Sequence, residues 1–293
     1  MLFQVVHTTH YLYVDAAMEA YLEVRLTPPS RAEHQIIRHR IDFQPGARVS
    51  DYVDYFGNRT TFYSMTLRHH QLKVTNRLTI RTHPRTLPEE GLALTVAEAR
   101  QILRTGGTAV FDYLQPTGST PIGGDALVWA REILRESRPL RDGLEELNTR
   151  IHREFKYRSG STEIETPLAH IWKAREGVCQ DFAHVMLSVL RAARLPCRYV
   201  CGYIESEPAF PADSSRKRLV GSLATHAWVE VLVPGLLWVA LDPTNNQWCG
   251  EQHVTIAVGR DFLDATPVRG TFKGSASQKM KVHVSMRRIP KKS

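Results

Sequence analysis

The spacing of apolar residues changes near residues 84–88, and this change strongly constrains how the chain can fold. Before it, apolar and polar side chains alternate, most clearly over residues 71–81. Strict alternation over such a length indicates a half-buried β-strand. Similar runs occur at residues 22–26 and 37–43, with no helical pattern between them. These first residues therefore predict an antiparallel β-sandwich.

Beyond residue 88 the apolar spacing becomes helical. Thr95-Val-Ala-Glu98 has the form of a capping box and predicts a short helix to about Arg104. A second helix is expected over residues 125–137. A third is predicted by one apolar stripe, which contains Leu140, Leu144, Leu147, Ile151 and Phe155.

The remaining patterns alternate between helix and strand. Thr166-Pro167 predicts the start of a helix that runs to about Glu176 and stops at Gly177, and an apolar helix is expected to begin at Cys179. A strand over residues 197–204 and a polar loop over 205–222 follow. Two apolar strands, 225–233 and 236–242, are then separated by Pro234-Gly235, which is a hairpin signal.

Together these patterns predict an α+β protein with four parts. Residues 1–85 form a β domain, 86–155 a helical connection, 156–270 the core, and 271–293 a basic C-terminal segment. The formal net charge is +8, and we interpret the basic end as a solvated tail because no RNA-binding aromatic signature or zinc finger accompanies it. No nucleic-acid partner is therefore expected. The basic residues of this end are Lys279, Lys281, Arg287, Arg288, Lys291 and Lys292.

Composition also bounds the location and the cofactors. No apolar run reaches the roughly 18–20 residues of a transmembrane helix, and the first residues read as a strand instead of a signal peptide. We therefore expect a cytoplasmic protein with no membrane partner. The four cysteines form no CxxC pair and no zinc pattern, which fits a reducing compartment. No metal or other cofactor is expected.

Cys179 is the first candidate for chemistry, because it stands where one segment ends at Gly177 and a helix begins. A helix N-terminus carries partial positive charge and free N–H groups, which favour a thiolate and can hold an oxyanion. The alternative is a buried structural cysteine. If Cys179 is a nucleophile, its own N–H group would supply one oxyanion donor, and the second donor is not assigned.

The hairpin supplies a base and an orienting acid, which a cysteine nucleophile needs. Counting outward equally from Pro234 places His226 directly opposite Asp242, with Cβ atoms about 4.5–5.5 Å apart. The alternative is a surface cross-strand pair. Both strands are otherwise apolar, so a polar pair between them needs a reason. Cys179, His226 and Asp242 are therefore the predicted catalytic residues.

Other residues near these positions receive different interpretations. Asp181 is expected to accept N–H bonds at the helix start or to pair with a basic neighbour, and His184 to serve the core or the surface. Tyr157 and Trp172 are hypothetical cleft residues. The residues expected simply to pack are Cys197, Cys201, Trp228 and Trp238.

Three sequence blocks resemble one known family. These blocks are Gly-Val-Cys-Gln-Asp-Phe-Ala-His at 177–184, Thr-His-Ala-Trp-Val-Glu-Val at 225–231, and Trp-Val-Ala-Leu-Asp-Pro-Thr-Asn at 238–245. Together they resemble the transglutaminase-like superfamily of papain-type fold. The N-terminal β region is similar to the β domain of bacterial transglutaminase-like proteins, and residues 258–262 with 267–270 resemble their C-terminal block.

The resemblance implies a fold and a chemistry. It implies a β-sandwich-like domain followed by a papain-like core, in which the nucleophile helix packs on an antiparallel sheet. By the same resemblance Cys179 is the nucleophile, His226 the base and Asp242 the orienting acid. Members of this family cross-link glutamine side chains to amines, hydrolyse amides, or have lost the chemistry.

Among these activities we expect a metal-independent cysteine hydrolase, because the chain shows no acidic calcium-loop spacing. It would act on peptide or isopeptide amides through a thioester acyl-enzyme, with a peptide or protein as its partner. The alternatives are a protein-glutamine acyltransferase that uses an amine acceptor, and a non-catalytic peptide-binding module. The sequence leaves the substrate and the oligomeric state open.

Overall fold

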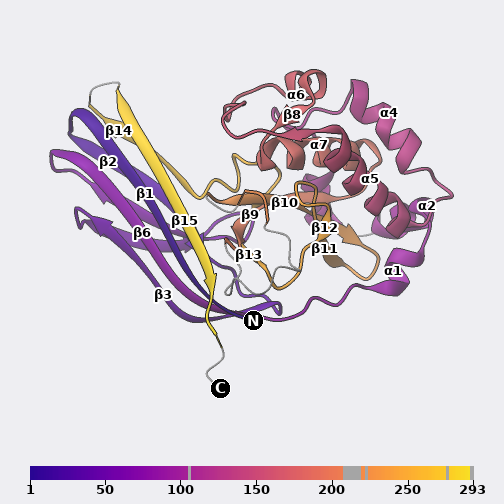
Figure 1. The fold of residues 1–293 in the computed structure, drawn as a ribbon, viewed down its shortest axis with the longest axis horizontal. Helices are drawn as coiled ribbons and strands as arrows, with labels where there is room; N and C mark the ends of the chain where they lie inside the picture. The colour runs from indigo at the N-terminus through magenta and orange to yellow at the C-terminus, as the bar shows by residue number, and fades with distance from the viewer. Residues whose placement is uncertain (105–106, 207–218, 222–223, 275–276, 291–293) are drawn as a thin grey trace.

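The computed structural model describes residues 1–104, 107–206, 219–221, 224–274 and 277–290. Two four-stranded antiparallel sheets stack as a sandwich at one end of the molecule. A five-stranded antiparallel sheet lies at the other end, with helices gathered on one side of it (Figure 1). The sandwich and the helix-covered sheet therefore form two distinct lobes.

The sandwich contains strands from both ends of the chain. One sheet has the order β15-β1-β6-β3, formed by β1 (Leu2–Ala17), β3 (His34–Gln44), β6 (His69–Thr82) and β15 (Gln278–Arg288). The other has the order β14-β2-β5-β4, formed by β2 (Glu19–Thr27), β4 (Arg48–Val53), β5 (Arg59–Met65) and β14 (Val268–Lys273). In β6 the predicted alternation is confirmed, since Leu72, Val74, Leu78 and Ile80 are all buried.

The C-terminal segment differs from the predicted solvated tail. β15 pairs with β1 over most of its length, with Val284 opposite His7. The tail prediction is therefore wrong for residues 278–288. The segment forms a strand because its side chains alternate between the two faces of the sheet. Val284 and Met286 face inward and are buried, while Lys279 and Lys281 are exposed. The basic side chains are solvated, but the backbone that carries them belongs to the sheet.

The helices follow the sequence patterns with small shifts at their ends. The capping box of α2 is confirmed, because Thr95 Oγ1 accepts from Glu98 N at 3.3 Å and Glu98 Oε2 accepts from Thr95 N at 2.8 Å. No helix among the described residues is long and apolar enough to cross a membrane. The helices are α1 (Glu89–Ala93), α2 (Val96–Leu103), α3 (Thr108–Phe111), α4 (Gly124–Ile133), α5 (Leu140–Glu154), α6 (Leu168–Ala174) and α7 (Cys179–Ala192), and a short 3₁₀ helix η1 spans Asp112–Leu114.

The predicted helix that stops at Gly177 is shorter than expected at both ends. α6 has Pro167 at its N-cap position, whereas Thr166 accepts a hydrogen bond from Glu163 N instead of capping the helix. It ends at Ala174 because Arg175 adopts a left-handed conformation with φ of 54°. Gly177 then lies in β8 (Glu176–Gly177), which pairs in parallel with β7 (Lys156–Tyr157).

The core sheet has the order β12-β11-β10-β9-β13, and α7 packs against β9 and β10. Its strands are β9 (Cys197–Ile204), β10 (His226–Val233), β11 (Leu237–Asp242), β12 (Gln247–Trp248) and β13 (His253–Gly259). The predicted polar loop at 205–222 falls mostly outside the described residues. The nucleophile helix thus lies on an antiparallel sheet, as the resemblance implied.

The hairpin register differs from the predicted one. Val229 lies opposite Leu241 and Val231 opposite Val239, so the turn is centred on Gly235 and not on Pro234. Gly235 and Leu236 both have positive φ and form the turn with Pro234, so each residue of β10 lies opposite a residue two positions later than predicted. His226 and Asp242 are therefore diagonal neighbours on the same face, and the prediction that they lie directly opposite is wrong.

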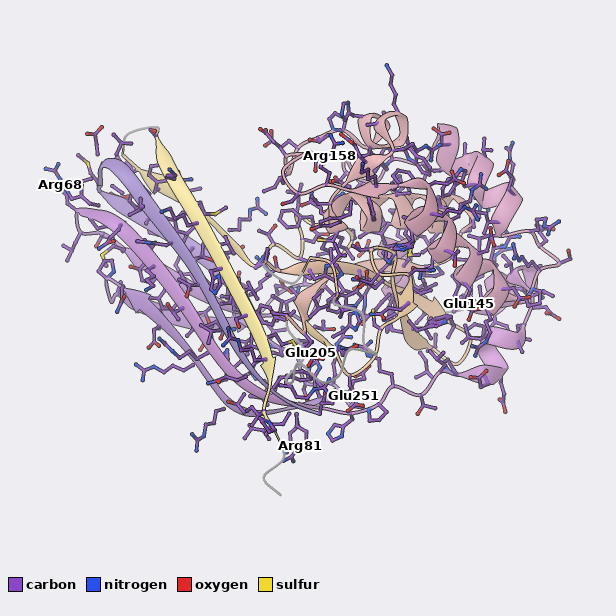
Figure 2. The ribbon with its side chains drawn as sticks, viewed as in Figure 1. Arg68, Arg81, Glu145, Arg158, Glu205 and Glu251 are labelled. Atoms are coloured by element: carbon purple, nitrogen blue, oxygen red, sulfur yellow. The ribbon has the colours of Figure 1, made fainter. Side chains whose placement is uncertain are left out.

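A buried polar network joins the sandwich to the core. His7 of β1 contacts the hydroxyl of Tyr203 on β9 through Nδ1 at 3.0 Å, and Asn76 of β6 donates to the same hydroxyl at 3.2 Å. Figure 2 shows Glu205, which follows β9, at the same junction. There its carboxylate accepts from Arg288 of β15 at 2.8 Å. Specific contacts therefore fix the two lobes against each other.

This junction predicts a loss of stability in mild acid. Burial lowers the pKa of His7 from the ordinary 6.5 to about 4. Between these two values the unfolded chain binds a proton that folded His7 does not, so the free energy of unfolding falls as pH falls through this window. Burial also lowers the pKa of His184 to about 4. His7→Gln removes one of these two groups and leaves His184. We therefore expect the free energy of unfolding to fall less steeply with pH in this variant, but still to fall.

The measurement is urea unfolding at several pH values between about 4 and 7, since the acid loss of stability spans that window. His10→Gln, at a partly exposed position of the same strand, is the matched control and should keep the wild-type slope. An unchanged slope in His7→Gln would show that this histidine is not buried as a neutral group.

Candidate active site

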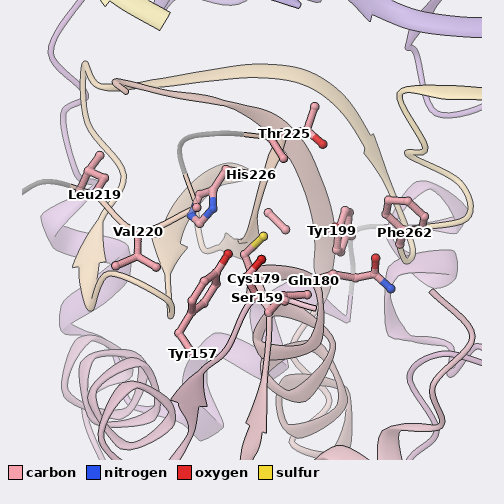
Figure 3. Close-up of a pocket in the computed structure, with 14 residues that line it drawn as sticks. Tyr157, Ser159, Cys179, Gln180, Tyr199, Leu219, Val220, Thr225, His226 and Phe262 are labelled. Carbon is pink, nitrogen blue, oxygen red and sulfur yellow. The ribbon is translucent and has the colours of Figure 1, made fainter. Parts of the chain in front are cut away.

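Cys179 is the first residue of α7, and it lines a pocket of about 530 Å³ (Figure 3). The chain enters the helix through Val178, whose backbone is extended. Asp181 fixes this entry, because its Oδ2 accepts from Val178 N at 2.8 Å and from Thr162 Oγ1 at 2.7 Å. This confirms the expected role of Asp181 in binding an N–H group at the helix start.

The glycine before the nucleophile is required by this close packing. A Cβ atom at Gly177 would lie 2.6 Å from Asp181 Oδ2, which is too short for a non-bonded contact. The segment that leads into α7 therefore passes directly over the carboxylate that caps the helix. The sequence Gly-Val-Cys-Gln-Asp thus places the thiol at a helix N-terminus whose N–H groups are partly free.

His226 lies beside Cys179 and is held by Asp242. Its Nε2 is 2.9 Å from Asp242 Oδ2, and both side chains are completely buried. Its other ring nitrogen, Nδ1, is buried, and the imidazole also interacts with the side chain of Cys179. Figure 3 shows the imidazole next to the sulfur of Cys179. The structure thus brings the three predicted residues together in one place.

The charges of these groups depend on one another. Burial alone would lower the pKa of His226 from its ordinary value of 6.5. The charges of Asp242 and Cys179 outweigh burial and raise this pKa to about 10. Burial alone would raise the pKa of Asp242. The interactions with His226 and His253 outweigh burial and hold this pKa well below its usual range. The arrangement therefore favours an imidazolium that faces the carboxylate of Asp242 at neutral pH.

Asp242 is surrounded by donors on both oxygens. Oδ1 accepts from the backbone N–H groups of Thr244 at 3.0 Å and Asn245 at 3.1 Å. Oδ2 accepts from Asn245 Nδ2 at 2.7 Å and lies 3.3 Å from His253 Nε2, in addition to its contact with His226. Such saturation keeps a buried carboxylate charged and in one orientation.

The sequence analysis missed the roles of His253 and Asn245. Gly250 N donates to His253 Nδ1 at 3.3 Å, so the proton of this ring is on Nε2, which faces Asp242. The ring also packs edge-on against Trp228, with centroids 5.3 Å apart. A histidine at the start of an otherwise apolar strand was the available signal, whereas its contact with Asp242 depends on the sheet order.

Asn245 also holds a short segment over the imidazole. Its Oδ1 accepts from Val220 N at 2.8 Å, and its Nδ2 donates to Val220 O at 3.3 Å. Gly221 follows with φ of +93°, and a Cβ there would lie 2.6 Å from His226 Nδ1. Residues 219–221 therefore cover His226, and glycine is required at the point of closest approach.

The described walls of the pocket are mainly aromatic and aliphatic. Tyr157 lines the pocket as hypothesised, but Trp172 does not. Trp172 instead packs against Phe155, with ring centroids 5.6 Å apart, and the guanidinium of Arg175 lies over its ring. It is therefore part of the apolar packing between the helices. The described lining contains no Asp, Glu, Lys or Arg, and it consists of Tyr157, Ser159, Val178, Cys179, Gln180, Tyr199, Leu219, Val220, Gly221, Ala224, Thr225, His226, Ala227 and Phe262.

The other thiols and the second histidine of α7 lie in the core. Burial raises the pKa of Cys197 to about 11 and that of Cys201 to about 12. His184 is buried, and its Nε2 accepts from Phe262 N at 3.2 Å. Trp228 is fully buried, as expected for a packing residue. Within the described ranges, no group of three or more His, Cys, Asp or Glu side chains could hold a metal ion.

The contact between His253 and Asp242 can be tested by stability. His253→Phe removes a hydrogen bond to a buried charge, and we expect it to lower the free energy of unfolding by about 1.5–3 kcal/mol. His253→Gln retains a donor and should lose less. In an Asp242→Asn background the effect of His253→Phe should shrink, because the charge that it contacts is absent.

Chemical denaturation of the four variants of this cycle measures the coupling. His283→Phe is the control, since His283 is exposed on β15, and its effect should stay within about 0.5 kcal/mol. Strictly additive losses in the double variant would contradict a direct interaction between His253 and Asp242.

The chain matches two family models. Residues 128–243 match the Transglutaminase-like superfamily, and residues 3–81 match the Bacterial transglutaminase-like N-terminal region. An uncharacterized protein of Mycobacterium tuberculosis is 33% identical over 275 residues, which cover 92% of this chain and 86% of that protein. A Protein-glutamine gamma-glutamyltransferase of Pseudomonas aeruginosa is 40% identical over 74 residues, which cover 25% of this chain and 11% of that protein.

A solved structure shares the fold of the whole chain. The crystal structure of a "Putative Cysteine Protease" from Cytophaga hutchinsonii superposes with a TM-score of 0.79 at 18% identity, covering 100% of this chain and 92% of that one. This likeness confirms the predicted fold class, a β-sandwich region with a papain-like core. With both family models and the mycobacterial relative in agreement, the chain belongs to the transglutaminase-like superfamily.

Proposed function

We propose that this protein is a cysteine-dependent hydrolase of peptide or isopeptide amides. The observation that carries the proposal is the juxtaposition of Cys179, at a helix N-terminus in a pocket, with a buried His226 held by Asp242 at 2.9 Å. A thiol, a base and an orienting acid in this order form a complete nucleophilic unit. The family supports such chemistry, because it includes amide-cleaving and amide-exchanging enzymes.

The proposed reaction has two halves. The Cys179 thiolate attacks the amide carbonyl carbon, and the carbonyl oxygen becomes an oxyanion. His226 donates its proton to the leaving nitrogen, the C–N bond breaks, and a thioester remains on Cys179. His226 then accepts a proton from water, whose oxygen attacks the thioester and releases the acid. The raised pKa of His226 suits it to begin the cycle as the proton donor.

A second candidate is transfer of the acyl group to an amine. It is favoured by the similarity to the Pseudomonas aeruginosa protein, whose name describes a glutamyl transfer. The first half of the reaction would be identical, with the amide of a glutamine side chain as acyl donor. An amine, instead of water, would then attack the thioester. The two candidates differ only in the acceptor.

Selective alkylation tests the nucleophile. Iodoacetamide at neutral pH should modify Cys179 well ahead of Cys197, Cys201 and Cys249, because burial raises the pKa of those three thiols. His226→Ala should slow the modification of Cys179 by about tenfold or more, since the thiolate loses its cationic neighbour. Peptide mapping by mass spectrometry measures both rates.

Cys249→Ala is the control for alkylation and should leave the rate at Cys179 unchanged. A rate at Cys179 no faster than that of a small free thiol, or one unaffected by His226→Ala, would count against a catalytic thiol.

The acceptor can be identified by mass spectrometry of products. Glutamine-containing and isopeptide-containing peptides are incubated with the protein, with and without methylamine. Hydrolysis predicts a thioester adduct on Cys179 that decays to the free acid even with the amine present. A predominant methylamide product would establish transfer instead of hydrolysis. Peptide binding that survives Cys179→Ala, without any adduct on the wild type, would indicate a binding module.

A further inference from the structure

We propose that the hydroxyl group of Tyr157 is the second oxyanion donor, acting with the backbone N–H group of Cys179. The inference rests on the proposed function and assigns a further catalytic residue to the same site. It accounts for the donor that the sequence leaves unassigned. The position of the Tyr157 backbone, the direction of its side chain and the engagement of nearby donors all support it.

The backbone of Tyr157 is tied to the segment that leads into the nucleophile helix. In the parallel pair of β7 and β8, Tyr157 lies beside Gly177, two residues before Cys179. Arg158 N donates to Gly177 O at 2.9 Å, and Lys156 N donates to Arg175 O at 2.8 Å. This short pairing fixes Tyr157 relative to the helix N-terminus, which is the precision that an oxyanion donor requires.

The side chain of Tyr157 points at the reacting groups. Its ring packs edge-on against Phe182 of α7, with centroids 6.3 Å apart and planes at 87°. Figure 3 shows its hydroxyl directed toward the sulfur of Cys179. A Cβ built on Gly221 would lie 3.7 Å from this hydroxyl and 2.6 Å from His226 Nδ1, so one small volume adjoins both groups.

The hydroxyl is in the right protonation state to donate. Burial, together with the charge of Cys179, raises the pKa of Tyr157 to about 12. The phenol therefore keeps its proton at neutral pH and can donate a hydrogen bond to a negative oxygen. Among the described residues, no group accepts a hydrogen bond from the hydroxyl of Tyr157, so this hydroxyl is available to a substrate.

Three other polar side chains of the pocket, those of Gln180, Thr225 and Tyr199, are engaged or lie elsewhere. Gln180 Nε2 donates to Ile164 O at 3.3 Å. The hydroxyl of Thr225 interacts with the thiol of Cys201. Tyr199 packs against His184 and Phe262, and Figure 3 shows it across Cys179 from His226. Ser159 also lines the pocket, but the hydroxyl of Tyr157 is the one that adjoins the same small volume as His226 Nδ1.

The chemical role follows from the charge that forms during acylation. When the Cys179 sulfur bonds to the carbonyl carbon, the π electrons move to the oxygen. The N–H group of Cys179 and the O–H group of Tyr157 each donate a hydrogen bond to this oxyanion. When the C=O bond re-forms and the leaving group departs, both donors are released. Tyr157 keeps its proton throughout.

Two reactions of the same thiol separate this role from a structural one. Alkylation by iodoacetamide displaces iodide at a saturated carbon and forms no oxyanion, whereas acylation by p-nitrophenyl acetate passes through one. Tyr157→Phe removes the hydroxyl and retains the ring. We expect it to slow acylation, measured as the burst of p-nitrophenolate, by about tenfold to a thousandfold. Alkylation of Cys179 should stay within about twofold of the wild-type rate, since no oxyanion donor is involved.

Tyr52→Phe is the control, because it removes a tyrosine hydroxyl that donates to Glu23 on the sandwich and does not line this pocket, and it should change neither rate. Equal acylation by Tyr157→Phe and the wild type would overturn the inference and leave the proposed function standing. A parallel fall in both reactions would assign Tyr157 a purely structural role. The absence of any Cys179-dependent burst in the wild type would instead refute the proposed function, and the inference with it.

Discussion

The charged contact between His226 and Asp242 is the interaction on which the site depends. Both side chains are removed from water, and neither charge would survive burial without the other. Asp242 is stabilised further by backbone and side-chain donors from residues 244, 245 and 253. Strands β10, β11 and β13 and the turn between β11 and β12 supply these groups, and α7 brings Cys179 to them. The order of the strands in the core sheet therefore determines where His226 lies relative to the thiol of Cys179.

Much of this arrangement could be predicted from the sequence, because it depends on local patterns. The alternation in β6, the capping box of α2 and the start of α7 at Cys179 are each encoded within about a dozen residues. The pairing of His226 with Asp242 could be anticipated because a hairpin joins their strands. Its register could not, since Leu236 adopts positive φ and joins Pro234 and Gly235 in the turn, which moves the pairing by two positions. A shift of two positions keeps the same face, so the functional prediction was unaffected by this error.

The features that the sequence analysis missed depend on contacts between distant segments. His253 reaches Asp242 only because β13 is placed beside β9 in the sheet. β15 has the period of a strand, but its basic side chains favoured its interpretation as a solvated tail. What makes it a strand is the free edge of β1, some 270 residues earlier in the chain. Local composition carries little information about such an edge.

The pairing of β15 with β1 also has a consequence for how the chain assembles. The whole helix-and-sheet lobe is inserted between strands of one sandwich, so the first strand acquires its outer neighbour only when nearly the last residues are available. During synthesis the N-terminal sandwich has unpaired edges while the lobe with Cys179 is still being made. The lobe that carries the thiol is thus tethered at both of its ends to one pair of sheets, and the last strand of that pair is synthesised only after the whole lobe.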